Sequence, residues 1–157
     1  AGPARARGPA GERALRGLEA GTAVLFDARR GGVRHVLAHD ARVRSVALDA
    51  QARLALSGSE DGSARLWDVE SGAELQRWSH QADVRVVALA PDGSRAFTVS
   101  KYDHAVVWDT ATGLRLGELP VLRTRLMRGE TITAAAFSAD ARQLGYAGLR
   151  AWQTRRP

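Results

Sequence analysis

The sequence predicts an all-β fold built from repeated units, and three observations support this prediction. Aromatic-Asp pairs recur at equal intervals, in Phe26-Asp27, Trp67-Asp68 and Trp108-Asp109, and Trp152 follows Trp108 after a slightly longer interval. Three glycines keep the same spacing: Gly31, Gly72 and Gly113. From about residue 22 onward, short runs rich in Val and Leu are separated by Asp-Gly, Ser-Gly and Thr-Gly pairs, as in strands joined by tight turns.

We call the interval from Phe26 to Trp67 one repeat. A period of this length, with a Trp-Asp pair in the units, is the signature of the four-stranded blades of a β-propeller. A blade buries its apolar faces only by packing against its neighbours. We therefore expect a propeller segment of about three to four blades. Because closed propellers commonly have roughly four to eight blades, we expect an open arc. The remaining blades would come from the same longer chain, a second copy or another protein.

The first repeat is the weakest of the four. Residues 1–20 are rich in Gly, Pro, Ala and Arg and show no period, which is typical of a flexible tail or linker. We expect this tail to precede a propeller segment over residues 21–157. Phe26-Asp27 and the strand after it fit the repeat, whereas no inner strand is recognisable upstream.

In the second and third repeats every strand of a blade is recognisable, and we letter the strands a to d from the propeller axis outward. The a strands, Val43–Leu48 and Val84–Leu89, are almost entirely apolar, as expected for strands covered on both faces. Strands b, c and d follow at residues 52–57, 64–68 and 73–78 in the second repeat and at residues 94–100, 105–109 and 114–119 in the third.

The fourth repeat is shortened. We expect strands a, b and c at residues 132–137, 143–147 and 149–153. Its turn between b and c is four residues shorter than in the other repeats, and seven extra residues precede strand a. This alignment puts Trp152 at the strand position of Trp67 and Trp108.

The second and third repeats resemble the WD-repeat β-propeller family. In both of them a His precedes the strand c Trp at the same distance along the chain, His39 before Trp67 and His80 before Trp108. The resemblance implies a hydrogen-bonded network in each blade, joining this His to a Ser or Thr in strand b, an Asp in the turn after it, and the Trp. The implied members are His39, Ser57, Asp61 and Trp67 in one blade, and His80, Thr98, Asp103 and Trp108 in the next.

Composition limits the classes of partner. The formal net charge is +6, and Arg supplies all the basic residues except Lys101. This fits either the codon usage of a GC-rich genome or attraction of a polyanion by the Arg-rich ends. Without cysteine there is no disulfide or thiolate metal site, and no apolar run is long enough to span a membrane. The start at Ala1 and the end at Pro157 favour a segment of a longer chain.

The sequence offers no convincing active site. Ser57, His39 and Asp61 are the residue types of a hydrolase triad, but no Gly-x-Ser-x-Gly elbow occurs, and the implied network accounts for all three. His35 and His39 have the spacing of a helical metal pair, yet four residues along a strand span about 13 Å, too far for one ion. We expect no catalytic residue, no metal and no cofactor.

We expect instead a non-catalytic scaffold that binds a protein partner through loops between strands d and a, and through its open blade edges. In WD-repeat proteins such loops lie on the face that most often receives partners. The candidate contact residues are Arg123, Arg125, Met127 and Arg128 in the long loop, and Asp40, Arg42, Gln81 and Asp83 in the shorter ones. The alternatives are binding of nucleic acid or another polyanion, or an accessory role in a larger protein such as a bacterial kinase or protease.

Overall fold

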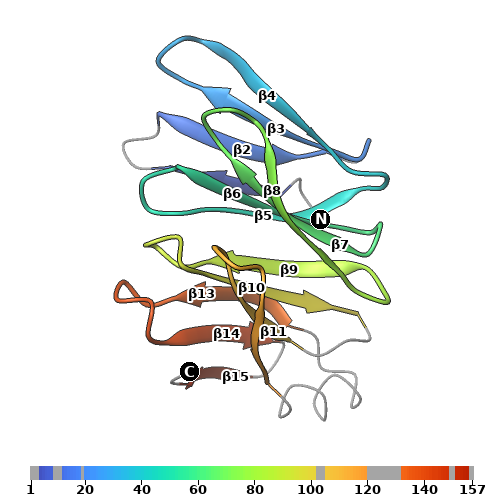
Figure 1. Ribbon diagram of the computed structural model, residues 1–157, viewed down its shortest axis with the longest axis vertical. Helices are drawn as coiled ribbons and strands as arrows, with labels where there is room; N and C mark the ends of the chain where they lie inside the picture. Colours follow the sequence, from blue (N-terminus) through green and yellow to red (C-terminus); the bar gives the residue numbers. More distant parts are fainter. Residues whose placement is uncertain are drawn as a thin grey trace.

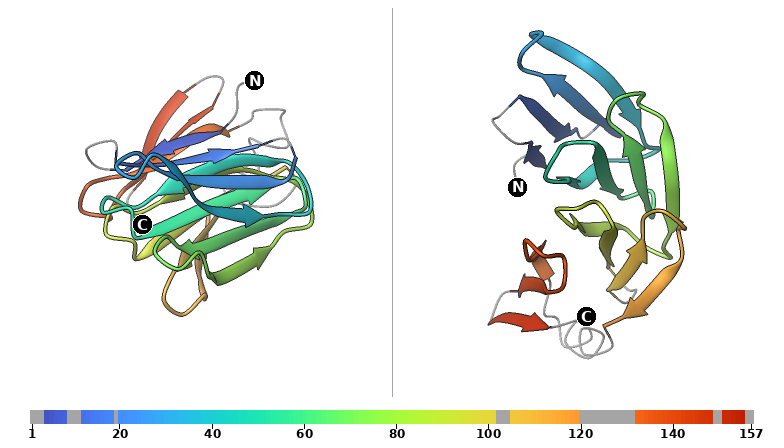
Figure 2. Two further views of the ribbon diagram at one scale, coloured as in Figure 1. Left: turned by 90° about the horizontal axis from the view of Figure 1, so that it is seen from above. Right: turned by 60° about the vertical axis from the view of Figure 1, so that its left-hand side comes forward.

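The computed structural model contains four antiparallel sheets stacked as an open arc (Figures 1 and 2). It describes residues 4–8, 12–18, 20–101, 105–119, 132–148 and 151–155, the last strand by its backbone only. Every regular element within these residues is a strand. The expectation of an all-β propeller segment that forms an open arc is therefore confirmed.

Each sheet is a blade of strands consecutive in the chain. Blade 1 contains β1 (Arg5–Arg7), β2 (Arg13–Gly17), β3 (Thr22–Asp27) and β4 (Gly32–Ala38). Blade 2 contains β5 (Val43–Leu48), β6 (Leu54–Ser59), β7 (Ser63–Asp68) and β8 (Glu74–Ser79). Blade 3 contains β9 (Val84–Leu89), β10 (Arg95–Ser100), β11 (Val106–Asp109) and β12 (Arg115–Glu118). Blade 4 contains β13 (Ile132–Phe137), β14 (Leu144–Gly148) and β15 (Ala151–Arg155).

Blade 1 corrects the expectation of a flexible tail over residues 1–20. Strands β1 and β2 occupy part of that stretch and pair with each other and with β3, which completes a four-stranded sheet. The repeat extends into β2, because three of its residues precede identical residues in β6 by one repeat. These pairs are Ala14 and Ala55, Leu15 and Leu56, and Gly17 and Gly58.

Blade 4 corrects the expected position of Trp152. Leu144 corresponds to Ala55 and Ala96, because all three pair with the last residue of their inner strand. Ala55 and Ala96 also pair with Trp67 and Trp108, but Leu144 pairs with Arg155. Trp152 lies three residues before Arg155 in β15 and pairs with Ala147 instead. The short hairpin after Gly148 sets this register, so that Trp152 does not stand at the position of the other two tryptophans.

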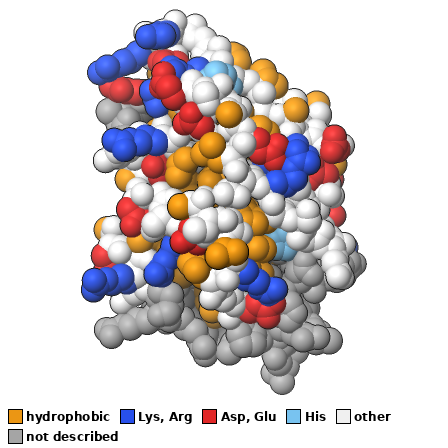
Figure 3. Space-filling model, viewed as in Figure 1, with side chains coloured by type: hydrophobic (Ala, Val, Ile, Leu, Met, Phe, Trp, Pro, Cys, Tyr) orange, Lys and Arg blue, Asp and Glu red, His pale blue; other side chains and the backbone are white. Residues whose placement is uncertain are grey.

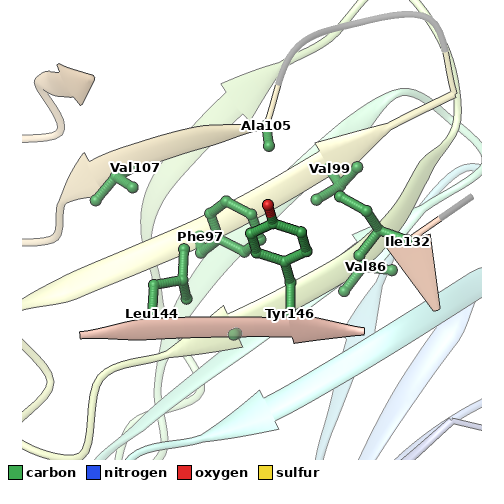
Figure 4. Close-up of a cluster of buried hydrophobic side chains, with 9 residues drawn as sticks. Val86, Phe97, Val99, Ala105, Val107, Ile132, Leu144 and Tyr146 are labelled. Carbon is green, nitrogen blue, oxygen red and sulfur yellow. The ribbon is translucent and has the colours of Figure 1, made fainter. Parts of the chain in front are cut away.

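The core lies between the blades, as three apolar clusters. Leu15, Leu56 and Phe97, each one repeat after the last, are the central residues of their second strands and are at most 1% exposed. Trp78 stacks on Trp108 across the contact between blades 2 and 3, with ring centroids 5.3 Å apart. Figure 4 shows the third cluster, in which Tyr146 and Leu144 of blade 4 pack against Phe97 of blade 3.

Glycine lets neighbouring blades approach closely at one repeated position. A Cβ on Gly58 would lie 2.7 Å from Val84 Cγ1 and 2.8 Å from Val87 Cγ1. Gly17 meets Val43 Cγ1 in the same way, at 2.8 Å. The next blade carries Val99 at the position of Gly58, and blade 4 then has Ile132 at the position of Val84 and the smaller Ala135 at that of Val87. The glycine is thus specific to the first two contacts between blades.

We predict that Gly58→Ala destabilises the protein by about 1–3 kcal/mol, because its methyl group would overpack the contact between blades 2 and 3. Adding Val87→Ala should recover part of this loss, since Val84 still crowds the site. Gly117→Ala is the control, because its Cβ would meet nothing within 4 Å. Urea unfolding of the four proteins measures the effect. Equal losses in the single and double variants would contradict this account of the contact.

Candidate functional site

Several connections meet at one end of the blades, which we call the loop end and define as residues 39–42, 60–62 and 80–83. Backbone hydrogen bonds tie them together. His39 N–H donates to Gly21 O at 2.7 Å, and Glu60 N–H donates to Arg42 O at 2.9 Å. His80 N–H likewise donates to Gly62 O at 2.7 Å. Both of these connections between blades are therefore held against the turn between the second and third strands of an adjacent blade.

A buried chain of side-chain hydrogen bonds supports this end in blade 2. Trp67 Nε1–H donates to Ser57 Oγ at 2.8 Å, and Ser57 Oγ lies 2.6 Å from His39 Nε2. His39 Nδ1 lies 3.0 Å from Asp61 Oδ2. The chain is satisfied when Ser57 donates to Nε2 and Nδ1–H donates to the carboxylate. The His39 side chain is wholly buried, which makes this group a structural clamp inside the blade.

The surroundings of the clamp keep Asp61 ionised and His39 neutral. Burial opposes the charge of Asp61, but hydrogen bonds from the hydroxyl and amide of Ser63, from the amide of Asp40 and from His39 outweigh it. They lower the pKa of Asp61 to about 2. Burial lowers the pKa of His39, and its hydrogen bond to Asp61 only partly compensates.

The structure adds two residues that the sequence analysis does not identify. Arg65 donates to Asp61 Oδ2 at 3.2 Å, to Ala38 O at 2.9 Å and to Ser63 Oγ at 3.0 Å. Ser63 in turn donates to Asp61 Oδ1 at 2.6 Å. The sequence does contain a sign of this role, since Arg65 is a charged residue in a buried third strand and blade 3 has Val106 at the same position. Asp61 compensates that buried charge.

Blade 3 contains the matching part of a second clamp. Trp108 Nε1–H donates to Thr98 Oγ1 at 2.8 Å, and Thr98 Oγ1 lies 3.0 Å from His80 Nε2. Asp103, the fourth residue expected here, lies outside the described residues. The hydroxyl, indole and imidazole thus have the same arrangement in both blades.

Four of the candidate contact residues lie in two neighbouring connections of the loop end. Asp40 and Arg42 are in the connection between β4 and β5, and Gln81 and Asp83 are in that between β8 and β9. Asp40 and Gln81 are exposed, whereas Arg42 and Asp83 are partly buried. The other four candidates, Arg123, Arg125, Met127 and Arg128, lie outside the described residues.

The burial of the clamp argues against the hydrolase triad that the sequence analysis considered. Ser57 is fully buried, and its oxygen is already occupied by Trp67 and His39. His35 instead contacts Glu70 O at 3.0 Å, so it does not share a ligand position with His39. Among the described residues no group of three or more His, Asp or Glu could hold a metal ion. The same part of the chain contains no helix suited to crossing a membrane.

We predict that Ser57→Ala destabilises the protein by about 2 kcal/mol, because it leaves the Trp67 indole N–H and the His39 imidazole without their buried partner. Ser57→Thr is the matched control, since Thr98 serves the same role in blade 3. Thermal or urea unfolding of both variants measures the difference. A loss as large for Thr as for Ala would show that the hydroxyl is not what stabilises this site.

The low pKa of His39 predicts a pH-dependent stability. Because the pKa of folded His39 lies below its ordinary value of 6.5, the unfolded chain takes up the proton more readily, and unfolding becomes easier as the pH falls below 6.5. The slope is at most about 1.4 kcal/mol per pH unit for one proton. His39→Asn removes this contribution, and the stability difference between wild type and variant should shrink between pH 7.5 and 5. Asp61 stays ionised throughout that range. A constant difference would argue against a neutral buried His39.

The comparison with protein families gives one match. Residues 31–68 match the family described as WD40: WD domain, G-beta repeat. The matched segment runs from the end of blade 1 through β7 and contains the whole clamp of His39, Ser57, Asp61 and Trp67. A search of curated proteins found no match to the chain. Residues 31–68 are therefore identified as a WD repeat, and the stacked four-stranded sheets on either side are consistent with WD-repeat blades in an open propeller arc.

Proposed function

We propose that this chain is a non-catalytic protein-interaction scaffold and that its loop end receives a protein partner. WD repeats serve in general as such scaffolds, which favours binding over catalysis here. Within the part of the chain that the structure describes, the Ser and His side chains that could be suspected of catalysis are buried in the clamp. Chemistry would need them at an accessible surface.

The observation that carries the proposal is the way Asp40 is held. Its backbone N–H donates to Asp61 Oδ2 at 3.1 Å, so the clamp fixes the main chain at this point. The side chain of Asp40 nevertheless remains 91% exposed, with Arg65 as a neighbouring cation at 3.6 Å. A charged group is thus presented to solvent on a rigid backbone. Preorganisation of this kind reduces the entropy lost when a partner binds.

The remaining candidates extend this surface. Gln81 and Asp83 belong to the equivalent connection one blade further along the arc, and Arg42 follows Asp40. We include Arg123, Arg125, Met127 and Arg128 from the sequence, because Arg and Met are enriched where proteins meet. The proposed partner surface therefore includes candidate residues of both charges together with Met127.

Site-specific photocrosslinking tests this proposal. A photoreactive amino acid at Asp40 or Gln81, in protein produced in its native cells, should give discrete adducts that protease removes and nuclease leaves intact. Ser71, exposed in the turn between β7 and β8 at the opposite end, is the control position. Adducts at Ser71 but not at Asp40 or Gln81 would refute the assignment of the loop end. Arg123, Arg125 and Arg128 changed together to Glu should abolish the adducts.

Binding of nucleic acid through the Arg-rich parts of the chain is the alternative function. It would give adducts that nuclease removes, and an affinity that falls steeply with added salt. A role as the accessory propeller of a larger enzyme is compatible with the same loop-end contacts. In that case the crosslinked protein would be a domain of the same chain.

A further inference from the structure

Blade 1 has a second face, opposite to the one that packs against blade 2, and we call it the outward face. Leu15, Ala23, Leu25 and Leu37 belong to the contact with blade 2. Alternation along the strands puts their sequence neighbours on the other side of the sheet. The cross-strand pairs of the outward face are Arg5 with Arg16, Arg7 with Ala14, Arg16 with Val24, Ala14 with Phe26, Val24 with Val36, and Phe26 with Val33.

The outer half of this face is apolar, and three of its side chains are accessible whereas Val24 is buried. Phe26 is 36% exposed, Val33 is 56% exposed and Val36 is 60% exposed. Figure 3 shows hydrophobic side chains along the upper right edge of the molecule, where Figure 1 places β4. Phe26 stands one repeat before Trp67, whose ring is buried in the contact with the preceding blade. Phe26 is therefore the corresponding anchor residue without a covering surface among the described residues.

The inner half of the face is a row of three exposed arginines, Arg5, Arg7 and Arg16. None of the three has an acidic partner within the described part of the chain. One repeat later, in blade 2, their positions hold Val46, Leu48 and Ser57, which cover or support a contact with the preceding blade. The blade after that holds Val87, Leu89 and Thr98.

This difference argues against another blade of the same kind as the occupant. An ordinary blade contact would take three guanidinium groups out of water without carboxylate partners, which is strongly unfavourable. A second copy would offer the far face of blade 4, whose described side chains include Ala134, Ala136 and Gly145 but no carboxylate. The described part of that face therefore offers the arginines no carboxylate.

We propose that the outward face of blade 1 docks an acidic protein surface, with carboxylates opposite Arg5, Arg7 and Arg16 and aliphatic side chains opposite Phe26, Val33 and Val36. This inference rests on the proposed function as a protein scaffold, but it uses a surface separate from the loop end. Guanidinium groups bind carboxylates through paired hydrogen bonds, and the apolar half adds area. A protein fits both halves, whereas a phosphate backbone fits only the first.

The test uses a labelled peptide in which a run of Glu is followed by a run of Val and Leu, with fluorescence anisotropy as the readout. Changing Arg5, Arg7 and Arg16 together to Glu should weaken its binding by about 10-fold or more at physiological salt. The matched control changes Arg53, Arg77 and Arg142, exposed on other blades, to Glu and should alter the affinity by less than about 3-fold. If the Glu variant does not fold, the triple change to Gln serves instead.

The apolar half has its own control. Val36→Ser should weaken peptide binding several-fold, whereas Leu75→Ser, at a similarly exposed residue of β8, should not. Sedimentation without peptide tests self-association, and a short heparin fragment tests a general polyanion site. A dimer lost in the Arg5, Arg7 and Arg16 variant, heparin binding that exceeds peptide binding, or no peptide binding at all would each overturn the inference. Crosslinking at Asp40 and Gln81 is independent of these outcomes, so the two proposals fail separately.

Discussion

The constraint on which this structure depends is that the faces by which the blades meet are apolar and cannot be left in water without cost. A sheet of four short strands cannot cover itself, so every blade is stable only as part of a stack. The three clusters between blades meet this requirement with side chains that recur once in every repeat, such as Leu15, Leu56 and Phe97. The periodicity of the sequence thus reflects one type of packing contact, which recurs at each of the three contacts between blades.

The clamps solve a different problem, which is to hold polar connections at the ends of apolar strands. In blade 2, the chain from Trp67 through Ser57 and His39 to Asp61 satisfies each buried polar group with another. Its last member also binds the backbone of Asp40. The interior of the blade therefore determines where an exposed loop side chain stands, and this connects stability with the proposed binding role.

The sequence predicts these features well where the repeat is regular. The inner strands of blades 2 and 3 have the expected bounds, and the residues expected around Ser57 lie together. The sequence does not predict the inner strand of blade 1, and the reason is physical. An inner strand is recognised by continuous apolar character, and this character is expected only where both faces of the strand are covered. Arg5 and Arg7 interrupt that character on the outward face of blade 1, which no described residue covers. The predicted position of Trp152 is wrong because the length of the turn between β14 and β15 sets which residues pair. The sequence alignment instead matches Trp152 to the other tryptophans by residue type.

The outward face of blade 1 can also be compared with a surface that only has to meet water. End repeats of stacked folds become soluble by carrying polar residues over their whole outer face. Here Arg5, Arg7 and Arg16 supply polarity to the inner half, yet Phe26, Val33 and Val36 leave the outer half apolar and exposed. A solubilising surface would not keep an aromatic residue at the position of Trp67. The division into a cationic row and an apolar patch fits the acidic partner proposed above, with charge setting the selectivity and the patch adding buried area.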